Sequence, residues 1–86
     1  MSQLTNLKAQ IESLAGQATT TAGGLDAFKG KFSQSMSQVQ QTIGGSAQRK
    51  DQELLTVLQD AQAKVDSASA ALRSAASSAR AYGASL

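Results

Sequence analysis

The 86-residue chain contains no cysteine, histidine, proline or tryptophan. Without cysteine it has no disulfides, no thiolate nucleophile and no thiolate metal ligand. Without histidine it also lacks the commonest general base and the commonest neutral metal ligand. We therefore expect a protein that is not an enzyme and that needs no metal or other cofactor.

Acid–base or metal chemistry would depend on six carboxylates: Glu12, Asp26, Asp51, Glu53, Asp60 and Asp66. Asp51 and Glu53 are two residues apart, so a helix would point them to different sides. Asp26 and Asp60 each have a lysine three or four residues later, which is the spacing of solvated ion pairs on a helix. The carboxylates therefore predict no catalytic residues and no metal site.

The net charge is also small: eight basic and six acidic residues leave a formal net charge of +2. The basic cluster of Lys29, Lys31, Arg49 and Lys50 is a weak signal for phosphate binding at so small an excess. The longest uncharged stretch, 32–48, is rich in serine and glutamine rather than leucine. It is therefore no membrane span. We expect no nucleic-acid partner and no stable membrane insertion.

Large apolar side chains are few, and alanine supplies 16 of the 35 hydrophobic residues. Domains of this size bury only about 60% of the surface that the unfolded chain exposes. An alanine-rich chain has still less apolar area to bury. A second chain is the natural source of the missing burial.

The first half of the chain shows helical spacing, with large apolar residues three or four positions apart. One unbroken heptad column contains Leu4, Ile11, Ala18, Leu25, Phe32 and Val39. Its expected companion starts with Leu7, Leu14 and Phe28 but is interrupted by small polar residues. This pattern predicts a helix over about 4–43. A break at Gly23-Gly24 would divide it, but the heptad column stays in phase across the pair, which favours one continuous helix.

The second half repeats the pattern after Gly44-Gly45-Ser46. One heptad column contains Ala47, Leu54, Ala61, Ala68, Ala75 and Tyr82, and the other contains Asp51, Leu58, Val65, Leu72, Ala79 and Leu86. We predict a turn at 44–46, Ser46 as the N-cap residue and a second helix over about 47–83. The short connection makes the helices antiparallel neighbours.

The expected fold is all-α, a single antiparallel helical hairpin over 1–86 that pairs with a second hairpin into a four-helix bundle. Within the hairpin we expect two sets of side chains to face each other. They are Leu54, Leu58, Val65 and Leu72 on one helix and Leu7, Leu14, Leu25, Phe28, Phe32 and Val39 on the other. Residues beside this seam are candidates for the partner interface: Met36, Ile43, Leu55 and Val57.

This layout resembles the WXG-100 family, the small helical-hairpin substrates of type VII secretion. The tripeptide Ile43-Gly44-Gly45 lies where the family has Trp-x-Gly at the turn, with the glycine kept and the tryptophan replaced. Near the C-terminus the family often has Tyr-x-x-x-Asp/Glu, and here Tyr82 matches while Leu86 stands in the acidic position. The resemblance implies a secreted protein, a homo- or heterodimeric bundle and an export signal at Tyr82 and Leu86 that a secretion ATPase recognises.

Localisation and function have alternatives. The N-terminal stretch lacks the basic start and the apolar core of a cleaved signal peptide, so we expect a cytoplasmic protein or one exported without such a signal. A self-assembling subunit like the type III secretion needle is a rival, although such hairpins usually carry a proline in the turn. A lipid-surface protein is disfavoured by polar faces rich in serine and glutamine rather than lysine and arginine. The remaining alternative is that the chain is a general coiled-coil adaptor protein.

Overall fold

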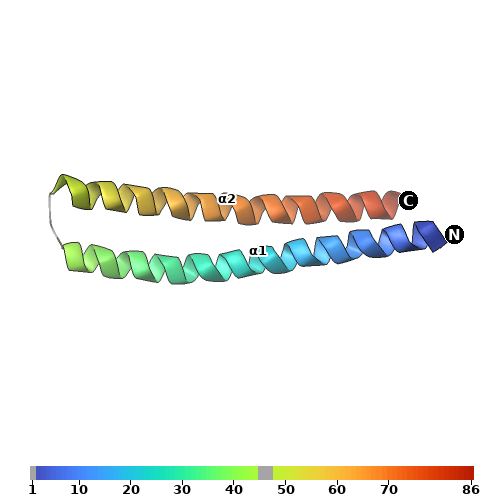
Figure 1. Cartoon of the computed structure of the whole chain (residues 1–86), viewed down its shortest axis with the longest axis horizontal. Coiled ribbons are helices and arrows are strands. Elements are labelled where there is room, and N and C mark those ends of the chain that lie inside the picture. The colour runs from blue at the N-terminus through green and yellow to red at the C-terminus, as the bar shows by residue number, and fades with distance from the viewer. Residues whose placement is uncertain (1, 45–47) are drawn as a thin grey trace.

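The computed structural model describes residues 2–44 and 48–86, which form two long helices. Helix α1 (Ser2–Ile43) and helix α2 (Arg49–Ser85) lie side by side in opposite directions (Figure 1). The hairpin is about 66 Å long, 17 Å wide and 13 Å thick. The predicted all-α antiparallel hairpin, with its one reversal near the middle of the chain, is confirmed.

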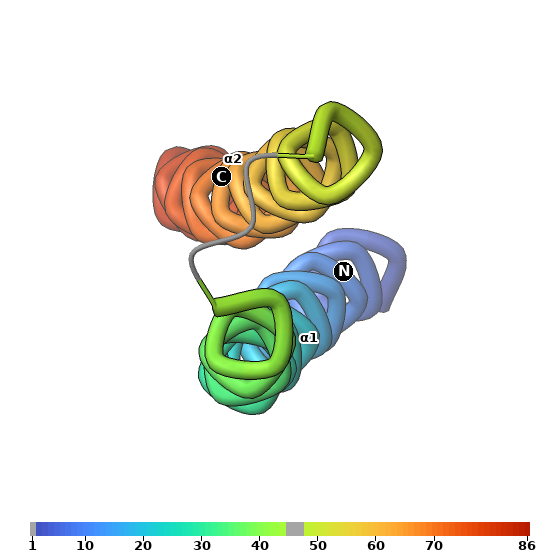
Figure 2. The backbone as a smooth tube through the Cα atoms, turned by 90° about the vertical axis from the view of Figure 1, so that its left-hand side faces the viewer, coloured from blue at the N-terminus to red at the C-terminus, as the bar shows by residue number. Residues whose placement is uncertain are grey.

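Helix α1 continues without a break through Gly23-Gly24, as the heptad phase predicted. A methyl group added at either glycine would meet no atom within 4 Å, so neither glycine serves a close approach of α2. Viewed along its length, the hairpin shows the two helices winding around each other (Figure 2). A seven-residue repeat is slightly shorter than two turns of an ideal helix, and supercoiling keeps the repeated positions in contact.

The two helix ends at the turn differ in how they are closed. Gly44 has φ +63° and its N–H donates to the Gln40 carbonyl at 2.9 Å, an arrangement common after the last residue of a helix. The N-cap residue of α2 is Gln48, in an extended conformation, so the prediction of Ser46 is wrong. Gly45, Ser46 and Ala47 lie outside the described residues.

Small side chains, together with Met36, form the buried part of the seam between the helices. Ala15 and Ala22 are 0% exposed, and opposite them Ser69 and Ala76 are nearly as buried. Beside them are half-buried residues from the two columns that the sequence placed in the seam: Leu25, Phe32 and Val39 on α1, and Leu58, Val65 and Leu72 on α2. One seam column of each helix is therefore as predicted.

The other predicted column of each helix lies outside the seam. Leu7, Leu14, Phe28, Leu54 and Tyr82 are all exposed, with Leu14 at 59% and Phe28 at 51%. These side chains do not face the opposite helix as expected. The seam instead uses the column one position later along each chain. In the half away from the turn this column carries Ala15 and Ala22 on α1 with Ser69 and Ala76 on α2, and small side chains let two backbones approach closely. Near the turn it carries Met36, Ile43 and Leu55.

Candidate interaction surface

Ion pairs between the helices gather along one flank of the seam. Lys29 Nζ lies 2.9 Å from Asp66 Oδ1, Arg80 Nε lies 3.3 Å from Glu12 Oε1, and Arg73 pairs with Asp26. The acidic residues of α1 are fourteen positions apart and the charged residues of α2 are seven apart, so each set forms one heptad column. We call this flank the polar edge: Glu12 and Asp26 on α1 with Asp66, Arg73 and Arg80 on α2.

Asp26 is the most connected residue of the polar edge. It accepts a hydrogen bond from the Ser69 hydroxyl at 2.7 Å and another from Arg73. The Ser69 bond first, and the Arg73 bond second, hold the pKa of the Asp26 carboxyl below its usual value. Exposed ion pairs contribute little free energy each. We therefore read the polar edge as setting the register of α2 against α1.

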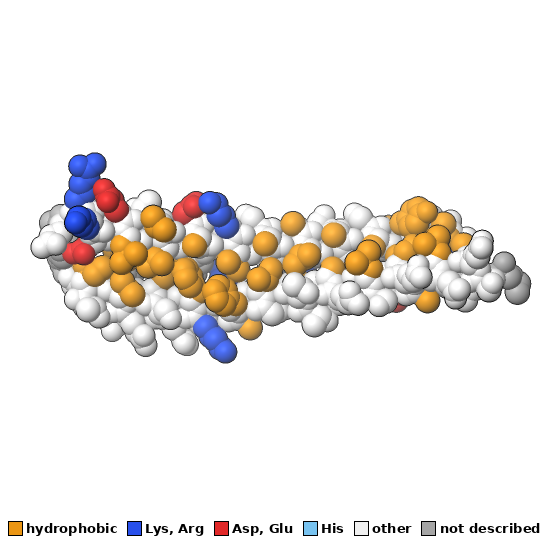
Figure 3. Space-filling model, in the orientation of Figure 1, with side chains coloured by type: hydrophobic (Ala, Val, Ile, Leu, Met, Phe, Trp, Pro, Cys, Tyr) orange, Lys and Arg blue, Asp and Glu red, His pale blue; other side chains and the backbone are white. Residues whose placement is uncertain are grey.

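The opposite flank of the seam is apolar. It consists of the heptad columns 7, 14, 21, 28, 35 and 42 on α1 and 54, 61, 68, 75 and 82 on α2, and we call it the apolar face. Leu14 follows Ile11 by three residues and precedes Ala18 by four, so it lies next to this seam column, on the side away from Glu12. The polar edge and the apolar face therefore point in opposite directions. Figure 3 shows a strip of hydrophobic side chains where the two helices meet. On the face drawn there, the charged side chains lie mainly in the half near the turn.

A hollow of about 350 Å³ interrupts the apolar face near the turn. Residues of both helices line it: Ser35, Gln38, Val39, Thr42, Ile43, Asp51 and Leu54. The hollow lies where the α1 column carries Ser35 and Thr42 instead of leucine or phenylalanine. It is therefore a consequence of small side chains at these positions of the apolar face.

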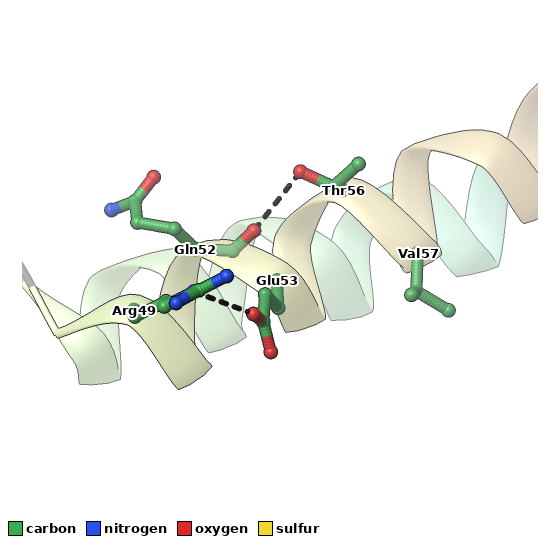
Figure 4. Close-up of a pocket in the computed structure, with 5 residues that line it drawn as sticks. All are labelled: Arg49, Gln52, Glu53, Thr56 and Val57. Carbon is green, nitrogen blue, oxygen red and sulfur yellow. Dashed lines mark hydrogen bonds and ion pairs between the residues drawn. The ribbon is translucent and has the colours of Figure 1, made fainter.

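A second hollow, of about 470 Å³, is lined by residues of α2 alone (Figure 4). Arg49 pairs with Glu53 at 3.1 Å, and the Thr56 hydroxyl donates to the Gln52 carbonyl at 3.0 Å. Both contacts join residues four apart on one helix. Helix α1 contributes no wall, so this hollow is a depression in the surface of α2.

Three of the four residues predicted for the partner interface lie between α1 and α2. Met36 is buried, and Ile43 and Leu55 are half-buried. Val57 is 63% exposed. The sequence reasoning passed over the exposed leucines and the phenylalanine of the apolar face because it placed them in the seam. Small polar residues interrupting their column, such as Thr21 and Ser35, were a signal that it was no core column.

The residues of the two short motifs are placed as follows. Ile43 is half-buried, Gly44 follows the end of α1, and Gly45 lies outside the described residues. Tyr82 is exposed in the last turn of α2, as a member of the apolar face. Leu86 is exposed and is the C-cap residue, with its N–H donating to the Gly83 carbonyl at 3.3 Å.

In 2–44 and 48–86 no three carboxylates come together as a metal site would require. Neither α1 nor α2 contains a stretch apolar enough to cross a membrane. Fold and surface together define a two-helix coiled-coil hairpin with one polar edge and one apolar face. No family model, no curated protein and no solved structure matches the chain.

Proposed function

We propose that the chain is a protein–protein interaction module that acts as one half of a homo- or heterodimeric helical bundle. The observation that carries the proposal is the exposure of its large apolar side chains on one face. Leu7, Leu14, Phe28, Leu54 and Tyr82 all belong to the apolar face, while the ion pairs between the helices occupy the other flank. Contiguous apolar surface rimmed by polar residues marks interaction sites in soluble proteins.

The composition of the seam supports the same proposal. Within 2–44 and 48–86 no large side chain is fully buried, and the fully buried residues are Ala15 and Ala22. Apolar burial contributes about 25 cal/mol per Å². A seam whose fully buried members are alanines, and whose larger members are mostly half-buried, gains less by this route. A second hairpin on the apolar face would add the burial of its leucines and aromatic rings.

The biological setting that we propose is export as a folded pair, without a cleaved signal peptide, as the resemblance to WXG-100 substrates implies. The end of α1 at Ile43 supports it, because the turn motif of that family begins at this position; Gly45, which takes the place of the motif's glycine, lies outside the described residues. Ile43 in place of tryptophan and Leu86 in place of an acidic residue are departures from the family pattern. Measuring the chain in culture medium, with and without an active type VII secretion ATPase, tests this setting.

The interaction proposal is tested by thermal unfolding at several protein concentrations, followed by circular dichroism. Because the unfolding of a dimer releases two chains, its midpoint temperature rises with concentration. We expect this rise for the chain alone or for its mixture with a related hairpin. A cooperative midpoint that stays constant over a hundredfold range in both samples would contradict the proposal.

Self-assembly into a filament, like a type III needle subunit, is the alternative. A filament needs two different surfaces that bind head to tail. The large exposed side chains of this hairpin lie mainly on one face, which favours a closed pair. Species much larger than two hairpins, growing with concentration, would instead support the filament.

A further inference from the structure

We propose that the second hairpin is another copy of this chain, docked antiparallel on the apolar face. In this arrangement the turn of each copy covers the open end of the other, around a two-fold axis near the middle of the hairpin. This inference rests on the proposed bundle and specifies its partner, face and orientation.

The sizes of the side chains along α1 are self-complementary. The apolar-face column of α1 contains Leu7, Leu14, Thr21, Phe28, Ser35 and Thr42. A two-fold axis between positions 24 and 25 places 7 against 42, 14 against 35, and 21 against 28 of the second copy. Each of these pairings puts a large side chain on a small one, which is how packed helical layers fill space.

Helix α2 follows the same order except at Leu54, a large side chain that lies near Thr42 at the turn end. The contacts of Lys29 with Asp66 and of Asp26 with Ser69 show that opposite residue numbers add to about 95. Tyr82 therefore lies across from Leu14, so both helices carry a large side chain at this level of the hairpin.

The same register places small side chains across from each other at two other levels of the hairpin. Ala61 lies across from Ser35, and Ala75 lies across from Thr21. The two-fold axis brings Leu14 and Tyr82 of one copy onto Ser35 and Ala61 of the other. Phe28 meets the small layer of Thr21 and Ala75. The size pattern of both helices thus favours the same antiparallel docking.

The hollow near the turn is where this docking needs space. Ser35 and Thr42 are part of its lining, and its volume is about 350 Å³. The residues that the two-fold axis brings there are Leu14 and Leu7, both exposed in the hairpin. Helix α1 also extends beyond the end of α2 (Figure 1), so Leu7 and Leu4 have little of α2 opposite them. The turn end of the second copy would cover both leucines.

The opposite, parallel docking is disfavoured by size and by charge. With a two-fold axis along the hairpin, it would place Leu14 against Tyr82 of the second copy, large on large, and Ser35 against Ala61, small on small. It would also bring Lys31 and Lys64, which border the apolar face at one level of the hairpin, close to the same lysines of the second copy. Antiparallel docking places them instead over Gln17 and Ser78, which carry no charge.

The area is adequate for a stable pair. One face of the hairpin measures about 66 by 17 Å. A second copy covering it would bury roughly 1,000 Å² of each chain, or roughly 2,000 Å² in total, which is where obligate dimer interfaces begin. A single helix or a short peptide would cover about half of this face and leave one column of exposed side chains uncovered.

Cysteine cross-linking tests the docking directly, because the chain has no cysteine of its own. The double variant Leu14→Cys/Ser35→Cys places thiols at positions that the two-fold axis brings together. Within one helix these positions are about 30 Å apart at 1.5 Å per residue, so they cannot bond within a chain. On mild oxidation of the full chain we expect a covalent dimer from the double variant and almost none from either single variant.

The matched control is Thr5→Cys/Gln40→Cys, in the α1 heptad column that carries Glu12 and Asp26 on the polar edge. The two-fold axis brings these positions to within about one helical turn of the same level, but on the sides of the two helices that face away from the docking surface. This control should give no covalent dimer. Both sites of each variant are exposed, and circular dichroism verifies that the helices are retained. Dimers from either single variant would show a contact that this two-fold axis does not produce and would overturn the proposal, as would dimers from the control pair.

The remaining outcomes separate the docking from the proposed function. A wild-type chain that sediments as a dimer but gives no cross-link at 14 and 35 overturns the docking alone. A chain that pairs only with a different hairpin overturns the second copy as partner. A chain that stays monomeric, and gains helix content only on phosphatidylcholine vesicles, assigns the apolar face to a lipid surface and contradicts the bundle itself.

Discussion

The Ser69 hydroxyl, 3% exposed, donates a hydrogen bond of 2.7 Å to the carboxylate of Asp26, 43 positions away in sequence. Ser69 lies within the alanine seam, and Asp26 lies on the polar edge beside it. The bond therefore joins the tightest part of the packing to the row of ion pairs. Small seam residues alone specify register weakly, because sliding one alanine past another changes little. A directional bond to one carboxylate supplies the specificity.

Acid should weaken this link. Because the folded state holds the pKa of Asp26 below the usual 3.8, Asp26 stabilises the fold above that pH. The contribution is lost as the pH falls through the lower pKa of the folded state. We expect Asp26→Asn to lower the midpoint temperature at neutral pH and to reduce its fall below about pH 4. Circular dichroism melts across this range measure both effects.

The control for this variant is Asp60→Asn. Asp60 pairs with Lys64 on the same helix, 3.0 Å away, and makes no link between the helices in the described structure. Its removal should leave the acid dependence close to that of the wild type. Equal acid dependence of wild type and Asp26→Asn would show that the Asp26 link does not stabilise the fold.

The seam should reject larger side chains. Ala22 is 0% exposed against α2, so Ala22→Leu forces the helices apart or out of register. Overpacking of this kind typically costs about 1–3 kcal/mol. Ala27→Leu, on the exposed side of α1, is the matched control and should be nearly neutral. Urea unfolding of the two variants compares the free energies, and equal values would contradict the small-residue seam.

Two glycines should respond to alanine with opposite signs. Gly44 has φ +63°, a conformation that costs an L-residue about 1 kcal/mol or more, so Gly44→Ala should destabilise the hairpin. Gly23 lies inside α1 with open space around it, so Gly23→Ala should stabilise it by about 1 kcal/mol. Destabilisation by Gly23→Ala in the same melts would show that α1 needs a flexible point there.

Tyr82 distinguishes an interface from an export signal. On the apolar face, Tyr82→Ala should weaken dimerisation about 30-fold, the loss typical when an aromatic hot-spot side chain is removed from an interface. Arg80→Gln removes one exposed ion pair on the polar edge and should change dimerisation little. Sedimentation velocity over a dilution series measures both variants. A Tyr82→Ala protein that dimerises like the wild type but is no longer secreted would assign Tyr82 to export.

The sequence was sufficient to predict the hairpin, the continuity of α1 and one seam column of each helix. Leu25, Phe32 and Val39 form an uninterrupted apolar column, and Leu58, Val65 and Leu72 form another. Heptad spacing of this strength determines both the helix and its buried side.

The second column of each helix was not predictable from hydrophobicity. Leu14 and Phe28 are larger than Ala15 and Ala22, and a scale based on transfer energy places the larger residues inside. The structure does the reverse because packing depends on both helices at once. Ala76 and Ser69 on α2 match alanines on α1, and this match appears only when the two helices are placed in register. The apolar face is the consequence, since the large side chains are displaced outward.

Sedimentation equilibrium of the full chain over a wide concentration range is the most direct test of pairing through the apolar face. We predict twice the single-chain mass of 8.8 kDa for the wild type. The variant Leu14→Gln/Tyr82→Gln, which changes only exposed residues of the apolar face, should return to the single-chain mass with its helices intact. A wild-type chain that sediments at 8.8 kDa throughout and still unfolds cooperatively would contradict the account.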